Sequence, residues 1–168
     1  MTKGSVRRVL IGAVGGCLAA YFVVIAALYF TQRSMIYPVP HISASIPDGY
    51  RQVSLQTADG LTLTALFRPP SADQRVIVFF HGNGDNWQGA ALANRDIAAG
   101  GYGVLLCEYR GYSANPGMPG EAGFYADGRA ALAWLAERGI GADRTVLVGN
   151  SIGSGPAKIG RASCRERV

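Results

Sequence analysis

Three short, almost wholly apolar runs constrain the fold of this chain more than any other feature. They lie at residues 76–80 (VIVFF), 104–107 and 145–148. A strand with one face in water alternates apolar and polar residues, so a run without a polar face is typical of a strand covered on both faces. The segments between the runs, 86–99 and 121–138, carry helical apolar spacing and end at glycines. This order predicts parallel strands joined by helical crossovers.

Two further strand patterns precede the first apolar run. Residues 50–57 and 61–67 alternate apolar and polar side chains on either side of an Ala-Asp-Gly turn at 58–60. Such alternation is typical of a half-buried antiparallel hairpin. We therefore predict an α/β fold over residues 50–157, in the order β-β-β-α-β-α-β, with a mostly parallel sheet and an antiparallel lead-in hairpin.

A segment of 22 residues without a charge lies near the N-terminus, at residues 9–30. As a helix it spans roughly 30 Å of hydrocarbon, which predicts one transmembrane helix. A cleaved signal peptide is the alternative, but its apolar region is shorter, about 7–15 residues. Basic residues in 1–8, and only Arg33 soon after the segment, predict a cytoplasmic N-terminus and a globular domain across the membrane. Residues 31–49, with three prolines, form the predicted connector.

The net charge of +5 is concentrated at the two ends of the chain. Residues 1–33 carry +4 and residues 158–168 carry +3, whereas residues 34–157 carry −2. The predicted domain is therefore slightly acidic and has no basic patch interleaved with aromatic residues, which argues against nucleic-acid binding. Apolar residues make up 49% of the chain, which excludes intrinsic disorder, and three cysteines are too few for a disulfide scaffold. Two histidines far apart, without paired ligands nearby, do not indicate a metal site.

Residues 158–168 look foreign to the rest of the chain. Residues 159–168 (IGRASCRERV) match, residue for residue, one translated frame of a common short-read sequencing adapter. Lys158 fits a codon that ends in the adapter's leading AG, and it is one of only two lysines against fourteen arginines. We therefore expect 158–168 to be a sequencing artefact outside the fold. A genuine basic tail is the alternative.

A Gly-x-Ser-x-Gly sequence at residues 149–153 directly follows the last apolar run. A serine exposed on a sharp turn from strand to helix needs neighbours without side chains, because the chain passes close to itself there. Gly149 and Gly153 meet this need, which makes Ser151 the predicted nucleophile. The following helix would point its N-terminus at the site and help to stabilise negative charge. A plain glycine-rich turn is the alternative, but the preceding strand favours the nucleophile.

A second glycine-rich loop, at residues 81–86 (HGNGDN), follows the 76–80 run. A loop leaving the third strand supplies the other half of an oxyanion hole in this arrangement, so we predict that the backbone N–H groups of Asn83 and Ile152 hold the developing oxyanion. His81 and Gly82 support the motif. We do not expect His81 to be the general base, because a histidine ahead of this loop more often braces it and the catalytic histidine comes last in chain order.

Together these segments resemble the N-terminal part of a membrane-anchored α/β-hydrolase, in the branch that includes serine aminopeptidase-like, acyl-thioesterase-like and lipase-like enzymes. The resemblance is carried by QRSMIYP, FFHGNGDN, EYRGYSANPGMPGEAGFYADGRAALAWL and VGNSIGSGPA, within residues 32–157. It implies that Ser151 is the nucleophile and that Asn83 and Ile152 are the oxyanion donors. The family requires further strands that carry a triad acid and a histidine. After Ser151 this chain has one acid, Glu166, and no histidine.

These features predict a fragment of a serine hydrolase that ends soon after its nucleophile. The complete enzyme would cleave a small acyl substrate (an ester, thioester or amide) through an acyl-enzyme on Ser151, without a cofactor. The chain as printed is expected to be inactive, because it lacks the triad acid and histidine. One alternative is a non-catalytic, membrane-tethered binding module of the same fold. Another is a genuine short product without a stable fold.

Overall fold

The computed structural model describes residues 3–39 and 45–158, and the contacts divide the chain into two units, Met1–Ile36 and Tyr37–Val168. Of the predicted artefact at 158–168, residues 159–168 lie outside the described residues. The first unit is a single helix, α1 (Lys3–Ile36), which is long and apolar enough to cross a membrane. It contains the predicted segment 9–30 and also six residues assigned to the connector. The helix ends two residues before Pro38, because the residue before a proline disfavours helical geometry.

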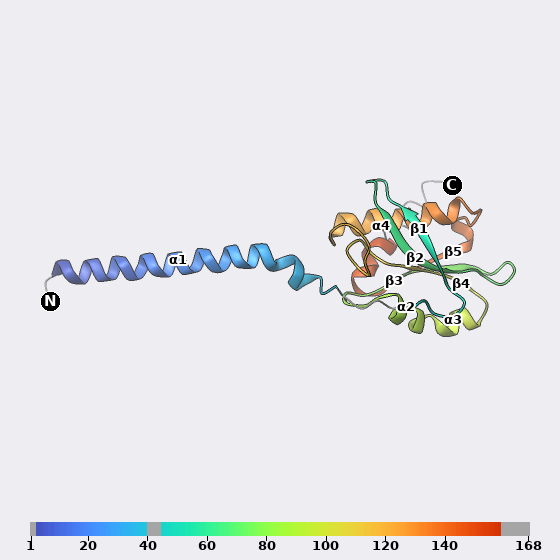
Figure 1. Ribbon diagram of the computed structural model, residues 1–168, viewed down its shortest axis with the longest axis horizontal. Coiled ribbons are helices and arrows are strands. Elements are labelled where there is room, and N and C mark those ends of the chain that lie inside the picture. Colours follow the sequence, from blue (N-terminus) through green and yellow to red (C-terminus); the bar gives the residue numbers. More distant parts are fainter. Residues whose placement is uncertain (1–2, 40–44, 159–168) are drawn as a thin grey trace. The chain divides into compact units, whose positions relative to one another are not determined.

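A five-stranded mixed sheet forms the centre of the second unit (Figure 1). Its strands are β1 (Arg51–Gln56), β2 (Thr62–Arg68), β3 (Val76–Phe80), β4 (Gly103–Cys107) and β5 (Thr145–Gly149). The order across the sheet is β1-β2-β4-β3-β5. The pairs β1–β2 and β2–β4 are antiparallel, whereas β3 pairs in parallel with both β4 and β5. The α/β fold with its lead-in hairpin is therefore confirmed, and each strand end lies within one residue of its predicted position.

Helices cover both faces of the sheet, as Figure 1 shows. On one face, α4 (Glu121–Ala136) packs with the core cluster that includes Phe80, Tyr109 and Trp134. On the other face, α2 (Trp87–Ala93) and α3 (Arg95–Ala99) pack with a second cluster. Every residue of β3 and β4 is buried, because both strands have neighbours at each edge and helices on both faces. Strand β5 has β3 at one edge and is only partly buried.

The predicted helix over 86–99 forms two helices instead of one. Asn94, at the break, has φ −103° and ψ 11°, and its buried side chain donates a 2.8 Å hydrogen bond to the Ala90 carbonyl. An asparagine side chain that bonds to a carbonyl four residues earlier competes with the helical backbone bonds. This local competition explains the break, which apolar spacing does not reveal.

Candidate active site

Ser151 is the first residue of a 3₁₀ turn, Ser151–Gly153, and one residue, Asn150, separates this turn from β5. Residues 154–158 continue as helix. Its side chain is exposed, and its backbone adopts φ +51°. This left-handed conformation costs an L-residue roughly 1–2 kcal/mol, because Cβ comes close to a carbonyl oxygen. Such conformations persist only where the surrounding structure imposes them, and they cluster at functional sites.

Gly149 and Gly153 allow the close approach that imposes this turn. A Cβ on Gly149 would lie 2.7 Å from the Cα of Ser154. A Cβ on Gly153 would lie 2.9 Å from the carbonyl oxygen of His81, and it would also meet the carbonyl of Phe80. In both cases the obstacle is backbone, which cannot rotate away as a side chain can. The structure therefore gives the spacing of the two glycines the steric reason expected from the sequence.

One hydrogen bond joins this turn to the end of β3, and another closes the turn itself. The Asn150 N–H donates to the Phe80 carbonyl at 2.9 Å, and the Gly153 N–H donates to the Asn150 carbonyl at 2.8 Å. A Cβ on Gly82 would lie 3.6 Å from the Cβ of Ser151. The structure therefore brings the serine turn and the start of the 81–86 loop together at the carboxyl ends of β3 and β5.

The two predicted oxyanion donors come from these adjoining segments. Asn83 lies in the exposed part of the 81–86 loop, where its side-chain oxygen accepts a 2.8 Å bond from the Tyr112 hydroxyl. Ile152 is half-buried, directly after Ser151, and packs against the core cluster of the α4 face. The assignment of their N–H groups to an oxyanion hole stays a prediction.

His81 is buried, and both nitrogens of its ring have partners. Nδ1 lies 2.8 Å from the Gly82 carbonyl oxygen, and Nε2 lies 3.0 Å from Oε1 of Glu108. Its own carbonyl accepts a 2.8 Å bond from the Tyr109 hydroxyl. A general base needs a nitrogen within reach of the proton that it removes. With both nitrogens occupied, the geometry suits the bracing role expected for His81 and not that of a base.

Sequence reasoning assigned no role to Glu108 or Tyr112, which contact this loop from the segment after β4. The carboxylate of Glu108 is buried and accepts one bond at each oxygen, from the His81 ring and from the Trp87 N–H. Burial raises the pKa of Tyr112 to about 12 and that of Tyr109 further. The available signal was a carboxylate directly after a wholly apolar strand, where a buried charge requires partners.

Arg110 anchors the same segment on its other side. Its guanidinium contacts Asp127 on α4 at 2.8 Å and Asp59 in the β1–β2 turn at 2.6 Å. The hydrogen bonds from Arg110 hold the pKa of Asp59 well below its usual range, whereas burial raises the pKa of Asp127. The residues that support the 81–86 loop are thus themselves held by charged contacts.

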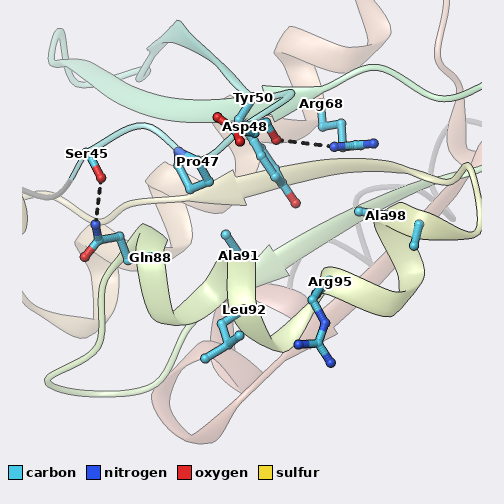
Figure 2. A pocket seen from close by; sticks show the side chains of 11 residues that line it. Ser45, Pro47, Asp48, Tyr50, Arg68, Gln88, Ala91, Leu92, Arg95 and Ala98 are labelled. Atoms are coloured by element: carbon cyan, nitrogen blue, oxygen red, sulfur yellow. Dashed lines mark hydrogen bonds between the residues drawn. The ribbon is translucent and has the colours of Figure 1, made fainter.

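A separate cavity of about 480 Å³ lies between residues 45–50, β2 and the helices α2 and α3 (Figure 2). Gln88 donates to the Ser45 hydroxyl at 3.0 Å, and Arg68 donates to the Asp48 carbonyl at 3.3 Å. None of the predicted site residues lines this cavity. Within residues 3–39 and 45–158, no group of three His, Cys, Asp or Glu side chains is placed to hold a metal ion.

No protein-family model matches this chain. Comparison with known sequences finds relatives in which the matched segment makes up about half of the protein. An uncharacterized protein of Mycobacterium tuberculosis is 37% identical over 145 residues, which cover 80% of this chain and 50% of that protein. The alpha/beta hydrolase domain-containing protein WAV2 of Arabidopsis thaliana is 33% identical over 147 residues, which cover 77% of this chain and 46% of that protein. The chain thus spans about half the length of these curated relatives.

Among solved structures, the esterase Pf2001 of Pyrococcus furiosus superimposes with a TM-score of 0.64 at 18% sequence identity. The match covers 76% of this chain and 51% of the esterase chain. The chain has an α/β-hydrolase fold. The described residues match part of the esterase chain, and Ser151 follows β5 at a strand-to-helix turn, where an α/β-hydrolase carries its nucleophile.

Proposed function

We propose that residues 37–157 form the nucleophile-bearing part of a serine hydrolase. The observation that carries this proposal is the left-handed backbone of Ser151, exposed between two glycines that cannot carry a Cβ. The Ser151 hydroxyl would attack the carbonyl carbon of an ester, thioester or amide while a base removes its proton. The alcohol, thiol or amine would leave with that proton, and water would release the acid from the acyl-enzyme.

The oxyanion formed during this attack would be held by the N–H groups of Asn83 and Ile152. Both segments adjoin Ser151, since the serine turn is bonded to Phe80 at the end of β3 and a Cβ on Gly82 would lie 3.6 Å from the Cβ of Ser151. Donors that are fixed before the reaction stabilise a transition state without reorganising, and each contributes about 3–4 kcal/mol.

The proposal requires a general base and an acid beyond those described. His81 is the one histidine among residues 3–39 and 45–158, and its ring is engaged elsewhere. We propose that the gene's reading frame continues past Ala157 with an Asp or Glu and then a His, and that residues 158–168 come from the sequencing adapter. Long-read sequencing of genomic DNA tests this directly. A genomic frame that encodes residues 158–168 and then stops would instead leave a fold without its catalytic base.

Hydrolysis and serine labelling test the function in the protein as its gene encodes it. Ser151→Ala should abolish labelling by a fluorophosphonate probe and lower the hydrolysis of p-nitrophenyl acetate to background. Ser154→Ala is the matched control, because this exposed serine lies three residues away and donates only to the Ser151 carbonyl. Labelling and hydrolysis that survive Ser151→Ala would refute the proposal. A folded wild-type protein that shows neither would favour the binding-module alternative.

We further propose that α1 anchors this domain in a membrane, with the N-terminus in the cytoplasm. Support comes from the charge-free stretch inside α1 and from the basic residues Arg7 and Arg8 before it. The domain would then meet its acyl substrate on the opposite side of the membrane.

A further inference from the structure

One carboxylate holds both ends of the 81–86 loop, which carries the predicted oxyanion donor Asn83 and is called the oxyanion loop below. Oε1 of Glu108 lies 3.0 Å from Nε2 of His81, the residue that opens the loop. Oε2 accepts a 3.0 Å bond from the Trp87 N–H, directly after the loop ends. The side chains of Glu108 and His81 are 0% and 1% exposed, so no water competes for these contacts.

Every polar side-chain atom of these two residues has a hydrogen-bond partner. Nδ1 of His81 faces a carbonyl oxygen, which can only accept, so this nitrogen carries a proton. Nε2 faces a carboxylate that already accepts from the Trp87 N–H. A buried polar contact in which every member is bonded restricts the position of its neighbours.

Tyr112 holds the middle of the loop from the same segment. Its buried ring lies 5.6 Å from the His81 ring, and its hydroxyl donates to the side chain of Asn83 at 2.8 Å. The segment is itself anchored, because Arg110 pairs with the buried Asp127 of α4. The loop therefore has two contact points, Glu108 and Tyr112, in the segment that follows β4.

We propose that Glu108 and Tyr112 are positioning residues that fix the oxyanion loop in its reactive geometry. This inference rests on the proposed function. Neither side chain needs to touch the substrate. Glu108 would set the path of the loop through His81 and Trp87, and Tyr112 would set the orientation of Asn83.

The expected kinetic signature follows from where an oxyanion donor acts. A misplaced donor weakens binding of the transition state and leaves ground-state binding nearly unchanged, so kcat falls while KM does not. Glu108→Ala removes both loop contacts, and we expect kcat to fall about 100-fold or more, as on loss of a donor. Glu108→Gln keeps the shape and an acceptor for the Trp87 N–H but loses the charge, so we expect a smaller fall of roughly 10-fold. Tyr112→Phe should also lower kcat roughly 10-fold, since it removes one hydroxyl.

The experiment compares these variants in the protein as its gene encodes it, with p-nitrophenyl acetate as substrate. Asp59→Asn is the matched control, because it removes a carboxylate bonded to the same segment while Arg110 keeps Asp127. We expect its kcat to stay within about twofold of wild type. Thermal midpoints of all variants separate a folding defect from a kinetic one. If Glu108→Ala does not fold, the isosteric Glu108→Gln and Tyr112→Phe still decide the question. Folded Glu108→Gln and Tyr112→Phe variants with wild-type kcat would overturn the proposal.

A second readout is independent of catalysis. Hydrogen exchange of the Trp87 amide, followed by NMR, should be faster in Glu108→Ala than in wild type, because that variant removes the acceptor of this N–H, and it should stay unchanged in Asp59→Asn. Equal exchange in Glu108→Ala and wild type would overturn the contact. If Ser151→Ala leaves hydrolysis unchanged, the proposed function fails, but the NMR comparison still tests the contact between Glu108 and the loop. The two failures are therefore distinguishable.

Discussion

Replacing Ser151 by glycine should stabilise the protein relative to replacing it by alanine, although glycine normally has the opposite effect. Both variants remove the predicted nucleophile, so activity does not distinguish them. They differ in how well they accept φ +51°. Alanine keeps the steric conflict of an L-residue in the left-handed region, whereas glycine has no Cβ and removes it.

The size of the effect follows from two opposing contributions. Relief of the conflict favours glycine by roughly 1–2 kcal/mol. The greater freedom of glycine in the unfolded chain favours alanine by about 0.4–1 kcal/mol. The glycine variant should therefore be more stable by about 1 kcal/mol, which corresponds to roughly 4 °C in the thermal midpoint of a domain of this size.

Ser154 provides the matched pair of control variants. It lies three residues further on, at φ −64° and ψ −29°, where any L-residue is relaxed. Ser154→Gly should be less stable than Ser154→Ala by about 0.5–1 kcal/mol. Both variants lose the hydroxyl bond to the Ser151 carbonyl, so that loss cancels in the comparison. The difference between the two alanine–glycine comparisons isolates the backbone conflict at Ser151.

Intrinsic fluorescence of the protein in detergent provides the assay. The chain has two tryptophans, Trp87 and Trp134, which are 7% and 6% exposed and lie on opposite faces of the sheet. Their emission should report unfolding of the whole domain. If glycine is the less stable substitution at both Ser151 and Ser154, the turn at Ser151 is unstrained and the main support for the nucleophile is lost.

Three further predictions test other parts of the structure. Gly153→Ala should destabilise the domain by about 1–3 kcal/mol and lower its thermal midpoint, because the new methyl group meets the backbone of β3, whereas Gly155→Ala meets only the ring of Tyr125 and should have little effect. Raising the pH from 10 towards 12 should lower the thermal midpoint, since burial raises the pKa of Tyr112 from 10.0 to about 12 and the folded state resists its ionisation; Tyr112→Phe should reduce this loss. Alkaline carbonate should leave the protein in the membrane pellet, and protease should reach the domain only from the side opposite an N-terminal tag; release into the supernatant would contradict anchoring by α1.

Local pattern was sufficient to predict the fold because burial on two faces leaves a direct trace in the sequence. β3 is apolar at every position, and the structure buries every one of its residues. The alternation in β1 and β2 likewise predicted the antiparallel hairpin. The prediction of one helix over 86–99 was wrong where a single side chain decides, since the break depends on what Asn94 bonds to and not on spacing.

In the candidate site, too, features set by neighbouring residues were predictable, whereas contacts between residues far apart in the sequence were not. The sharp turn at Ser151 was predictable because its requirement is local: the chain closes on itself there, and Gly149 and Gly153 have no room for a side chain. Glu108 was not predictable in the same way, because its partners are His81, 27 residues earlier, and Trp87, 21 residues earlier. Only the parallel pairing of β3 with β4 brings the loop and Glu108 to the same edge of the sheet.

The difference between local sterics and long-range contacts determines which substitutions the site should tolerate. Changes at Gly149 or Gly153 are opposed by sterics that the chain itself creates. Glu108 and His81 constrain each other, because the loss of either leaves a buried polar group without its partner. Single substitutions at the pair should therefore be more damaging than a double substitution that replaces both side chains by a neutral, hydrogen-bonded pair of similar volume. If the double variant loses as much stability as the two single variants lose together, the two side chains do not act as a unit.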